Sequence, residues 1–406
     1  MGFSGGPCAI ICLSFGINMD KCCKYFRIVC LTVILCCGGC GKVGFDELAP
    51  VVRDNLVLFG ETEIPGELQG VLGSSNIITL GETCYVQEHH VYVARLFEFL
   101  ADEGFTFFNE FPHAYSWMVE DYIIGEIQHI PYYIRLYNQV WVEKLREINL
   151  AQGPPYPVHL FFMDVNHNLD DFKTSIIESE KILGQQQIFA LIKILKVDGT
   201  AYYNELLSLK ESLEDESGGY LDTWGSKWYY RYLELIDMEI ESHLYRTGDS
   251  EEKREEFMRG IIESKKLQHP GLKTMVNCGM DHAQKETMMG TRITRIGAML
   301  EEDHPGETCS IAFVGISGKR RYSDDETETI NFNTLESAGK DDIIRIIGEE
   351  AGSSMGFLKL EHKIFREEMD ATYTAGAVRV APGRQFDAII SYPVITVLES
   401  LSDFTI

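Results

Sequence analysis

Short apolar runs that end in ionisable residues recur along this chain, and stretches with helical periodicity separate them. The runs are residues 77–80 before Glu82, 105–108 before Glu110, 158–163 before Asp164, and 274–278 before Asp281 and His282. Each run has the length of a buried strand, and apolar residues at helical spacing follow most of them. This alternation predicts an α/β fold with a mostly parallel central sheet and helices on both of its faces.

The spacing of apolar residues changes between residues 169 and 267. The period there is that of amphipathic helices, and no run reads as a strand. We therefore predict a large helical insertion inside one α/β domain. Helices are also predicted at 85–103, 112–124, 130–145 and 284–300, and further strands at 310–314, 357–360 and 386–390. The predicted divisions are a segment at 1–40, a polar lead-in at 41–75 and the α/β domain at 76–406.

The composition supports a globular protein and argues against nucleic-acid binding. With 406 residues, 45% of them hydrophobic and 11% aromatic, the chain can bury a sizeable core. Its formal net charge of −26 repels phosphate backbones and anionic lipid. We therefore expect a small-molecule substrate or ligand and no nucleic-acid partner.

The first forty residues have the pattern of an export signal. They hold eight of the eleven cysteines, and the bases Lys21, Lys24 and Arg27 precede an apolar run at 28–37 that is too short to span a bilayer. Small residues then lead into Cys40, as in a bacterial lipoprotein signal. This pattern predicts an exported protein of the bacterial cell envelope, anchored in the membrane by a lipid on Cys40. A soluble secreted protein and a retained anchor are the alternatives, and either Met1 or Met19 could be the start.

The ionisable residues at the strand ends are the candidate site. Carboxyl ends of parallel strands meet at one sheet edge, where α/β proteins bind ligands. Crowding raises the pKa of a carboxylate and suits it to act as a base near neutral pH, and a histidine can carry a second proton. Glu82, Glu110 and His282 are therefore the candidate catalytic residues. Asp164 and Asp281 are expected beside them, with capping or turn stabilisation as the alternative role of each.

The helix expected after Glu82 carries further candidates for binding. Glu88 and Arg95 could reach the carboxylates, although both also suit an exposed helix face. His89 and His90 are adjacent, so only one of them can face the site. Glu82, either histidine, Asp281 and His282 could together ligate zinc or manganese.

Other catalytic arrangements find little support in the sequence. The chain lacks the H-E-x-x-H motif of zinc hydrolases and the G-x-S-x-G elbow of serine hydrolases. Residues 315–319 lack the spacing of a phosphate-binding loop. Cys84 reads as a small buried residue rather than a nucleophile. No cofactor is therefore expected, with a metal or haem as the alternative.

Seven short stretches resemble the motifs of one protein superfamily in the same order. They are LGETCYVQEHH, FTFFNEF, VHLFFMDV, VNCGMDHAQK, MMGTRITRIGAML, SIAFVGI and FDAII, which lie within residues 76–390. These stretches resemble the erythromycin esterases and the related ChaN-like haem-uptake lipoproteins. The matched positions are Glu82, Glu110, Asp164, His282 and Lys285, whereas the first histidine of the family falls on Tyr85.

The resemblance implies hydrolysis of an ester or lactone-type bond by an activated water, without a metal. Glu82 and Glu110 would position the water, and His282 would help to transfer its proton. The alternative is a ligand-binding lipoprotein that has lost the first family histidine, with Tyr85, His89 or His90 as a haem ligand. An interaction protein that uses the aromatic-rich insertion is a third possibility.

Overall fold

A computed structural model describes residues 43–83, 86–183, 200–248, 250–287, 293–323, 326–332, 341–371 and 378–398. These residues belong to one compact unit, Val43–Ile406. The predicted signal segment with Cys40, and also Cys84 and Tyr85, lie outside the described residues. Within the described ranges, no helix has the length and apolar character needed to cross a membrane.

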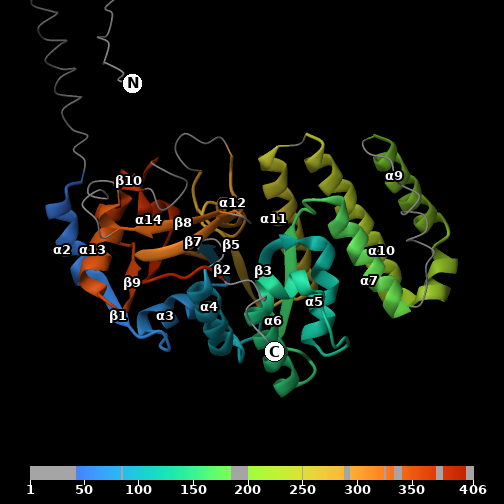
Figure 1. Cartoon of the computed structure of the whole chain (residues 1–406), viewed down its shortest axis with the longest axis horizontal. Helices are drawn as coiled ribbons and strands as arrows, with labels where there is room; N and C mark the ends of the chain where they lie inside the picture. The colour runs from blue at the N-terminus through green and yellow to red at the C-terminus, as the bar shows by residue number, and fades with distance from the viewer. Residues whose placement is uncertain are drawn as a thin grey trace, which may run out of the picture. The chain divides into compact units, whose positions relative to one another are not determined.

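The fold is built on an eight-stranded, mostly parallel sheet, as predicted (Figure 1). The five consecutive pairs from β12 to β4 are parallel, and β9 runs antiparallel to both β12 and β1. In spatial order the strands are β1 (Leu56–Phe59), β9 (Met355–Lys359), β12 (Ala388–Tyr392), β6 (Thr308–Gly315), β2 (Ile77–Glu82), β5 (Lys273–Gly279), β3 (Phe105–Pro112) and β4 (Val158–Asp164).

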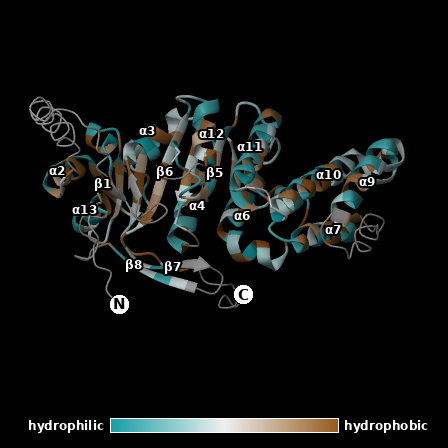
Figure 2. Ribbon diagram, turned by 90° about the horizontal axis from the view of Figure 1, so that it is seen from above, coloured by the Kyte–Doolittle hydropathy of each residue, from teal (hydrophilic) through white to brown (hydrophobic). Residues whose placement is uncertain are grey.

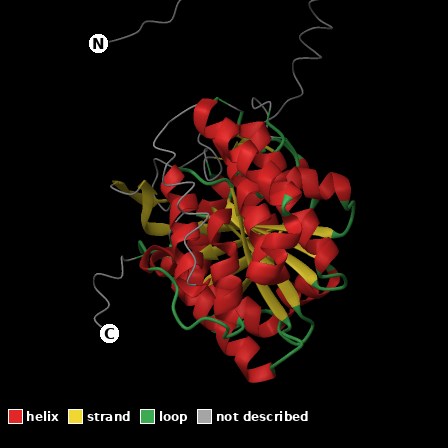
Figure 3. Ribbon diagram, turned by 90° about the vertical axis from the view of Figure 1, so that its right-hand side faces the viewer, coloured by secondary structure: helices red, strands yellow, loops and turns green. Residues whose placement is uncertain are grey.

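Helices cover both faces of this sheet (Figure 3). Neighbouring strand residues belong to two different hydrophobic cores, one on each face, as Phe107 and Phe108 of β3 do. Strands buried on both faces read as continuous apolar runs, which is why the sequence revealed them. Outside the insertion the helices are α2 (Phe45–Asn55), α3 (Gly66–Ser74), α4 (Gln87–Leu100), η1 (His113–Tyr115), α5 (Ser116–Ile123), α6 (Tyr132–Gln152), α12 (Ile296–Asp303), α13 (Asp342–Ala351), η3 (Lys363–Arg366) and α14 (Pro382–Gln385).

Between β4 and β5 the described chain is helical. Its helices are α7 (Leu169–Leu183), α9 (Thr200–Asp215), α10 (Ser217–Arg246) and α11 (Glu251–Gln268). Figure 2 shows hydrophobic and hydrophilic residues mixed along these helices, as in amphipathic helices. The last of them, α11, packs back against β4 and α12 and so returns to the sheet.

The predicted lead-in at 41–75 contains structure that the sequence did not reveal. Leu48 and Val52 of α2 are buried in the core, and β1 extends the sheet by pairing with β9. Neither segment shows the full apolar pattern of its element. Pro50 lies inside α2, and Leu58 of the edge strand β1 is exposed. The hairpins β7–β8 (Ser317–Ser323 and Glu326–Asn331) and β10–β11 (Met369–Ala371 and Val378–Val380) were also not predicted.

The predicted helix at 284–300 is wrong at the described residues 284–287 and 293–295 and correct at 296–300. The chain forms turns after β5, the described residues up to Thr287 are not helical, and α12 begins only at Ile296. The backbone packs closely at the start of this helix, since a Cβ atom added at Gly297 would lie 2.4 Å from the carbonyl oxygen of Ala283. Apolar spacing cannot reveal such a contact between segments.

Candidate functional site at the carboxyl edge of the sheet

The strand register brings the predicted acids and the histidine to one edge of the sheet. Glu82 at the end of β2 is the register partner of Gly279 at the end of β5. The backbone N–H of Gly279 donates to Glu110 Oε2 at 2.7 Å. His282 follows in the next turn, with its Nε2 3.4 Å from Glu110 Oε1. Glu82, Glu110 and His282 therefore converge.

Arg254, from the first turn of α11, joins two of the acids. Its Nη2 donates to Glu110 Oε1 at 2.6 Å and to Asp164 Oδ2 at 2.6 Å, and its Nε donates to Asp164 Oδ1 at 2.7 Å. His167 Nε2 also lies 2.8 Å from Asp164 Oδ2. Burial alone would raise the pKa of Asp164, but the hydrogen bonds and charges of His167 and Arg254 hold it well below its usual range. Asp164 is therefore an anion that positions Arg254.

His282 lies between two carboxylates. Its Nδ1 is 2.6 Å from Oε1 of Glu255, which is fully buried on α11. The other oxygen of Glu255 accepts the Ile296 N–H at 2.9 Å, and Arg295 Nη1 lies 2.6 Å from Glu255 Oε1. Burial lowers the pKa of His282, but Glu110 and Glu255 outweigh it, and the pKa rises above its ordinary value. The arrangement thus favours the imidazolium form.

Glu110 is held as an anion by the same network. Burial would raise its pKa, but the charges of His282 and Arg254 and the Gly279 N–H bring it below the ordinary value. Because its oxygens are already bonded to cations and to the backbone, Glu110 is a poor proton acceptor. Its chemistry is that of a fixed negative charge that orients His282 and Arg254.

Glu82 has the opposite electrostatic environment. Burial, with a smaller contribution from the charge of Glu110, raises its pKa to about 8, although the hydrogen bond from Asn277 opposes the shift. Asn277 Nδ2 donates to Glu82 Oε2 at 3.4 Å, and His89 Nε2 lies 3.5 Å from the same oxygen. Among these acids, Glu82 is the one whose proton can exchange near neutral pH.

A chain of buried amides fixes the groups around Glu82. His89 Nε2–H donates to Asn277 Oδ1 at 2.7 Å, and Asn277 Nδ2 donates to Asn109 Oδ1 at 2.9 Å. Asn109 Nδ2 then donates to Asn138 Oδ1 at 2.8 Å. These bonds pair the three buried amides and place the proton of His89 on Nε2.

The two adjacent histidines of α4 are core residues and not exposed ligands. His89 and His90 are 1% and 3% exposed. Burial lowers the pKa of His89 to about 4, and it lowers that of His90 well below its ordinary value. His90 stacks on Trp141 with ring centroids 3.9 Å apart. Of the two, His89 is the one that faces the strand ends, with its Nε2 beside Glu82 and Asn277.

Several further candidates lie elsewhere or have structural partners. Glu88 accepts hydrogen bonds from the N–H and hydroxyl of Thr396 at 2.8 and 2.6 Å, and so holds the segment after β12. Lys285 pairs with Asp387, just before β12, at 3.1 Å, which places it at the amino edge of the sheet. Arg95 lies further along α4, beside Tyr92, whose pKa its charge lowers in part. Asp281 accepts a hydrogen bond from Gln284 at 3.4 Å, and burial raises its pKa.

Sequence reasoning missed the residues that α11 and the strand interiors bring to the site. Arg254 and Glu255 belong to a highly charged helix that reads as a solvated surface, and their sequence distance from the strands gives no sign of contact. Asn109 and Asn277 did carry a signal, because an asparagine inside an otherwise apolar buried strand needs a polar partner.

The fold and the site define an α/β protein whose carboxyl sheet edge holds acids, a histidine and an arginine. No family model and no curated protein matches the sequence. Solved structures do match. A Bacillus cereus protein superposes with a TM-score of 0.64 at 17% identity, covering 88% of this chain and 100% of that chain. A succinoglycan biosynthesis protein gives a TM-score of 0.63 at 13% identity, covering 87% and 98% of the two chains.

An erythromycin esterase is also among the matching structures. A variant of EreC in its open conformation superposes with a TM-score of 0.59 at 14% identity, covering 84% of this chain and 98% of that chain. ChaN of Campylobacter jejuni, in a haem-bound structure, gives a TM-score of 0.29 at 16% identity over 64% of this chain and 91% of that chain. The resemblance predicted from the motifs is confirmed at the level of the fold, which this chain shares with erythromycin esterase.

Proposed function

We propose that this protein is a hydrolase that cleaves an ester or lactone-type bond in a small molecule with a water activated at Glu82. The observation that carries the proposal is that two neighbouring carboxyl groups at the strand ends have shifted pKa values in opposite directions. The pKa of Glu82 is raised to about 8, whereas that of the neighbouring Glu110 is lowered. Groups whose environments separate their pKa values in this way are suited to different acid–base roles.

The roles follow from the contacts of each group. The ionised Glu82 takes a proton from water as its oxygen bonds to the substrate carbonyl carbon. The cations of His282 and Arg254, which Glu110 holds in place, stabilise the negative oxygen that forms. When the tetrahedral intermediate collapses, the C–O bond breaks and the alkoxide takes a proton from Glu82. One water is consumed, and one acid and one alcohol are formed.

The test is hydrolysis of an ester and lactone panel by the full chain and by Glu82→Gln. We expect the substitution to reduce kcat/KM by a factor of about 100 or more, in the range of a lost acid–base catalyst. The wild-type kcat/KM should rise with pH and level off above about 8, where Glu82 is ionised. Glu88→Gln is the matched control, because Glu88 bonds only to Thr396 among the contacts described.

Two outcomes would overturn the proposal. One is equal activity of the wild type and Glu82→Gln. The other is absence of hydrolysis together with a Soret band on adding haem, which would support the ligand-binding alternative.

We further propose export to the bacterial cell envelope with a lipid on Cys40. The support is the sequence of residues 1–40 alone, with its basic residues, apolar run and small residues before the cysteine. Cells given radiolabelled palmitate should label the wild type and leave Cys40→Ala unlabelled. Equal labelling of both would exclude Cys40 as the site.

A further inference from the structure

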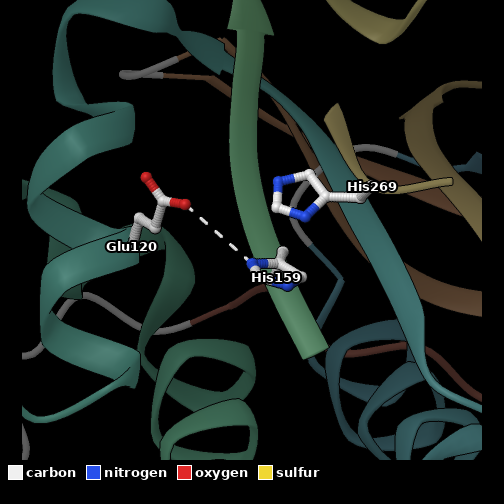
Figure 4. Close-up of side chains that lie close together, drawn as sticks. All are labelled: Glu120, His159 and His269. Atoms are coloured by element: carbon white, nitrogen blue, oxygen red, sulfur yellow. Dashed lines mark ion pairs between the residues drawn. The ribbon is translucent and has the colours of Figure 1, made fainter. Parts of the chain in front are cut away.

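A second group of side chains gathers at the outer edge of the sheet, away from the strand-end site. It consists of Glu120 on α5, His159 near the start of β4 and His269 directly after α11 (Figure 4). One ligand atom from each of the three lies within 4.8 Å of the other two. Among the described residues, this is the only group of three His, Cys, Asp or Glu side chains that meets such a distance limit.

The contacts within the group leave the Nδ1 atom of His159 available. His159 Nδ1 is 3.9 Å from Glu120 Oε1, too far for a hydrogen bond, and it has no other hydrogen-bond partner in the described part of the chain. The His159 and His269 rings lie with their centroids 3.9 Å apart.

We propose that Glu120, His159 and His269 bind a divalent transition metal ion, with zinc as the preferred metal. Two imidazoles and one carboxylate form a ligand set that suits zinc and leaves a fourth position for water. The three side chains are half-buried, and Glu120 also lines a small cavity of about 30 Å³ with Phe161 and Lys265. Lys265 pairs with Glu234 at 2.8 Å, so its positive charge is offset beside the site.

A metal ion bound to this group would also fix the position of one end of a helix. It would link α5 and β4 to the end of α11, the helix whose first turn carries Arg254 and Glu255. The distance along α11 from Arg254 to His269 is about 22 Å at the rise of an α-helix. The metal would therefore fix the far end of the helix that completes the carboxyl-edge site. The metal site itself does not depend on the proposed hydrolase activity.

The test uses Co²⁺ alone as the probe, with the full chain and with its accessible thiols alkylated so that the N-terminal cysteines do not bind. We expect one Co²⁺ per chain with visible d–d absorption, and binding at least tenfold weaker in His159→Gln, His269→Gln and Glu120→Gln. His304→Ala is the matched control, because His304 forms a histidine–carboxylate pair with Glu263 at 2.9 Å but lies outside the group. This variant should bind Co²⁺ as the wild type does.

Thermal unfolding separates a lost ligand from a misfolded variant. Co²⁺ should raise the Tm of the wild type and of His304→Ala, and it should leave the Tm of the folded His159→Gln and His269→Gln variants unchanged. Absence of Co²⁺ binding in the wild type would overturn the proposal. Unweakened binding in the double variant His159→Gln/His269→Gln would do the same. Hydrolase assays do not enter this test, so the two proposals can fail separately.

Discussion

At the scale of single residues, Glu82 links the proposed chemistry to stability. Its pKa is raised from 4.5 to about 8 by burial, so the folded protein binds a proton more tightly than the unfolded chain does. The stability that this proton contributes is present below about pH 4.5 and is lost as the pH rises towards 8. A group tuned for proton transfer near neutral pH therefore weakens the fold in the range where it works.

This linkage predicts how Glu82→Gln changes the pH dependence of unfolding. The neutral amide cannot ionise, so relative to the wild type the variant should gain about 4 kcal/mol of stability as the pH rises from 5 to 9. Urea midpoints of both proteins at the two pH values give the comparison. A constant difference between them would show that Glu82 titrates normally.

At the scale of elements, α11 is the helix on which the carboxyl-edge site depends. Arg254 in its first turn is 11% exposed at the side chain and holds two carboxylates. Removing one partner from such a buried ion network leaves uncompensated charge, which is more costly than removing the whole pair. The ion pairs of the site therefore fix the position of the helical insertion relative to the strands β3 and β4.

Arg254→Met should destabilise the protein by about 3–5 kcal/mol and abolish the proposed hydrolysis. The second substitution Asp164→Asn, in the Arg254→Met background, should recover part of that stability without recovering activity. Urea unfolding and ester hydrolysis of the wild type, the two single variants and the double variant form the complete cycle. Additive losses in the double variant would contradict a shared network.

A second prediction at this scale concerns the start of α12. Gly297→Ala places a Cβ 2.4 Å from the Ala283 carbonyl oxygen, so the backbone must shift, and we expect a loss of about 2 kcal/mol or more. Gly260→Ala, in the middle of α11 with no atom within 4 Å of the new Cβ, is the matched control. It should leave stability unchanged or raise it by about 1 kcal/mol. Thermal unfolding of both variants measures the difference.

The sequence was most informative about elements buried on two sides. Strands such as 105–108 and 158–163 appear as apolar runs because both faces of the sheet are covered, and their ends predicted the positions of Glu110 and Asp164. The sequence could not reveal Arg254 or Glu255, because their contacts depend on how α11 returns to the sheet. It also could not reveal β1, since an edge strand with an exposed Leu58 lacks that signal.

At the scale of the whole molecule, the net charge of −26 should affect substrate capture. A negative field attracts cationic small molecules and repels anionic ones, and salt screens both effects. If two esters of similar reactivity differ in charge, raising the ionic strength from about 10 to 200 mM should lower kcat/KM for the cationic ester and raise it for the anionic one. Identical salt dependence for both esters would contradict steering by the overall charge.

The edge strand β1 has a consequence for synthesis. Leu56 pairs with Leu358. The strand β1 is therefore synthesised early, but its partner β9 lies about 300 residues later in the chain. During translation β1 leaves the ribosome long before β9, and its hydrogen-bonding edge stays open until most of the domain exists. Because such distant pairing slows folding, closure of this edge should be a late event, and chains cut short before β9 should be prone to aggregate.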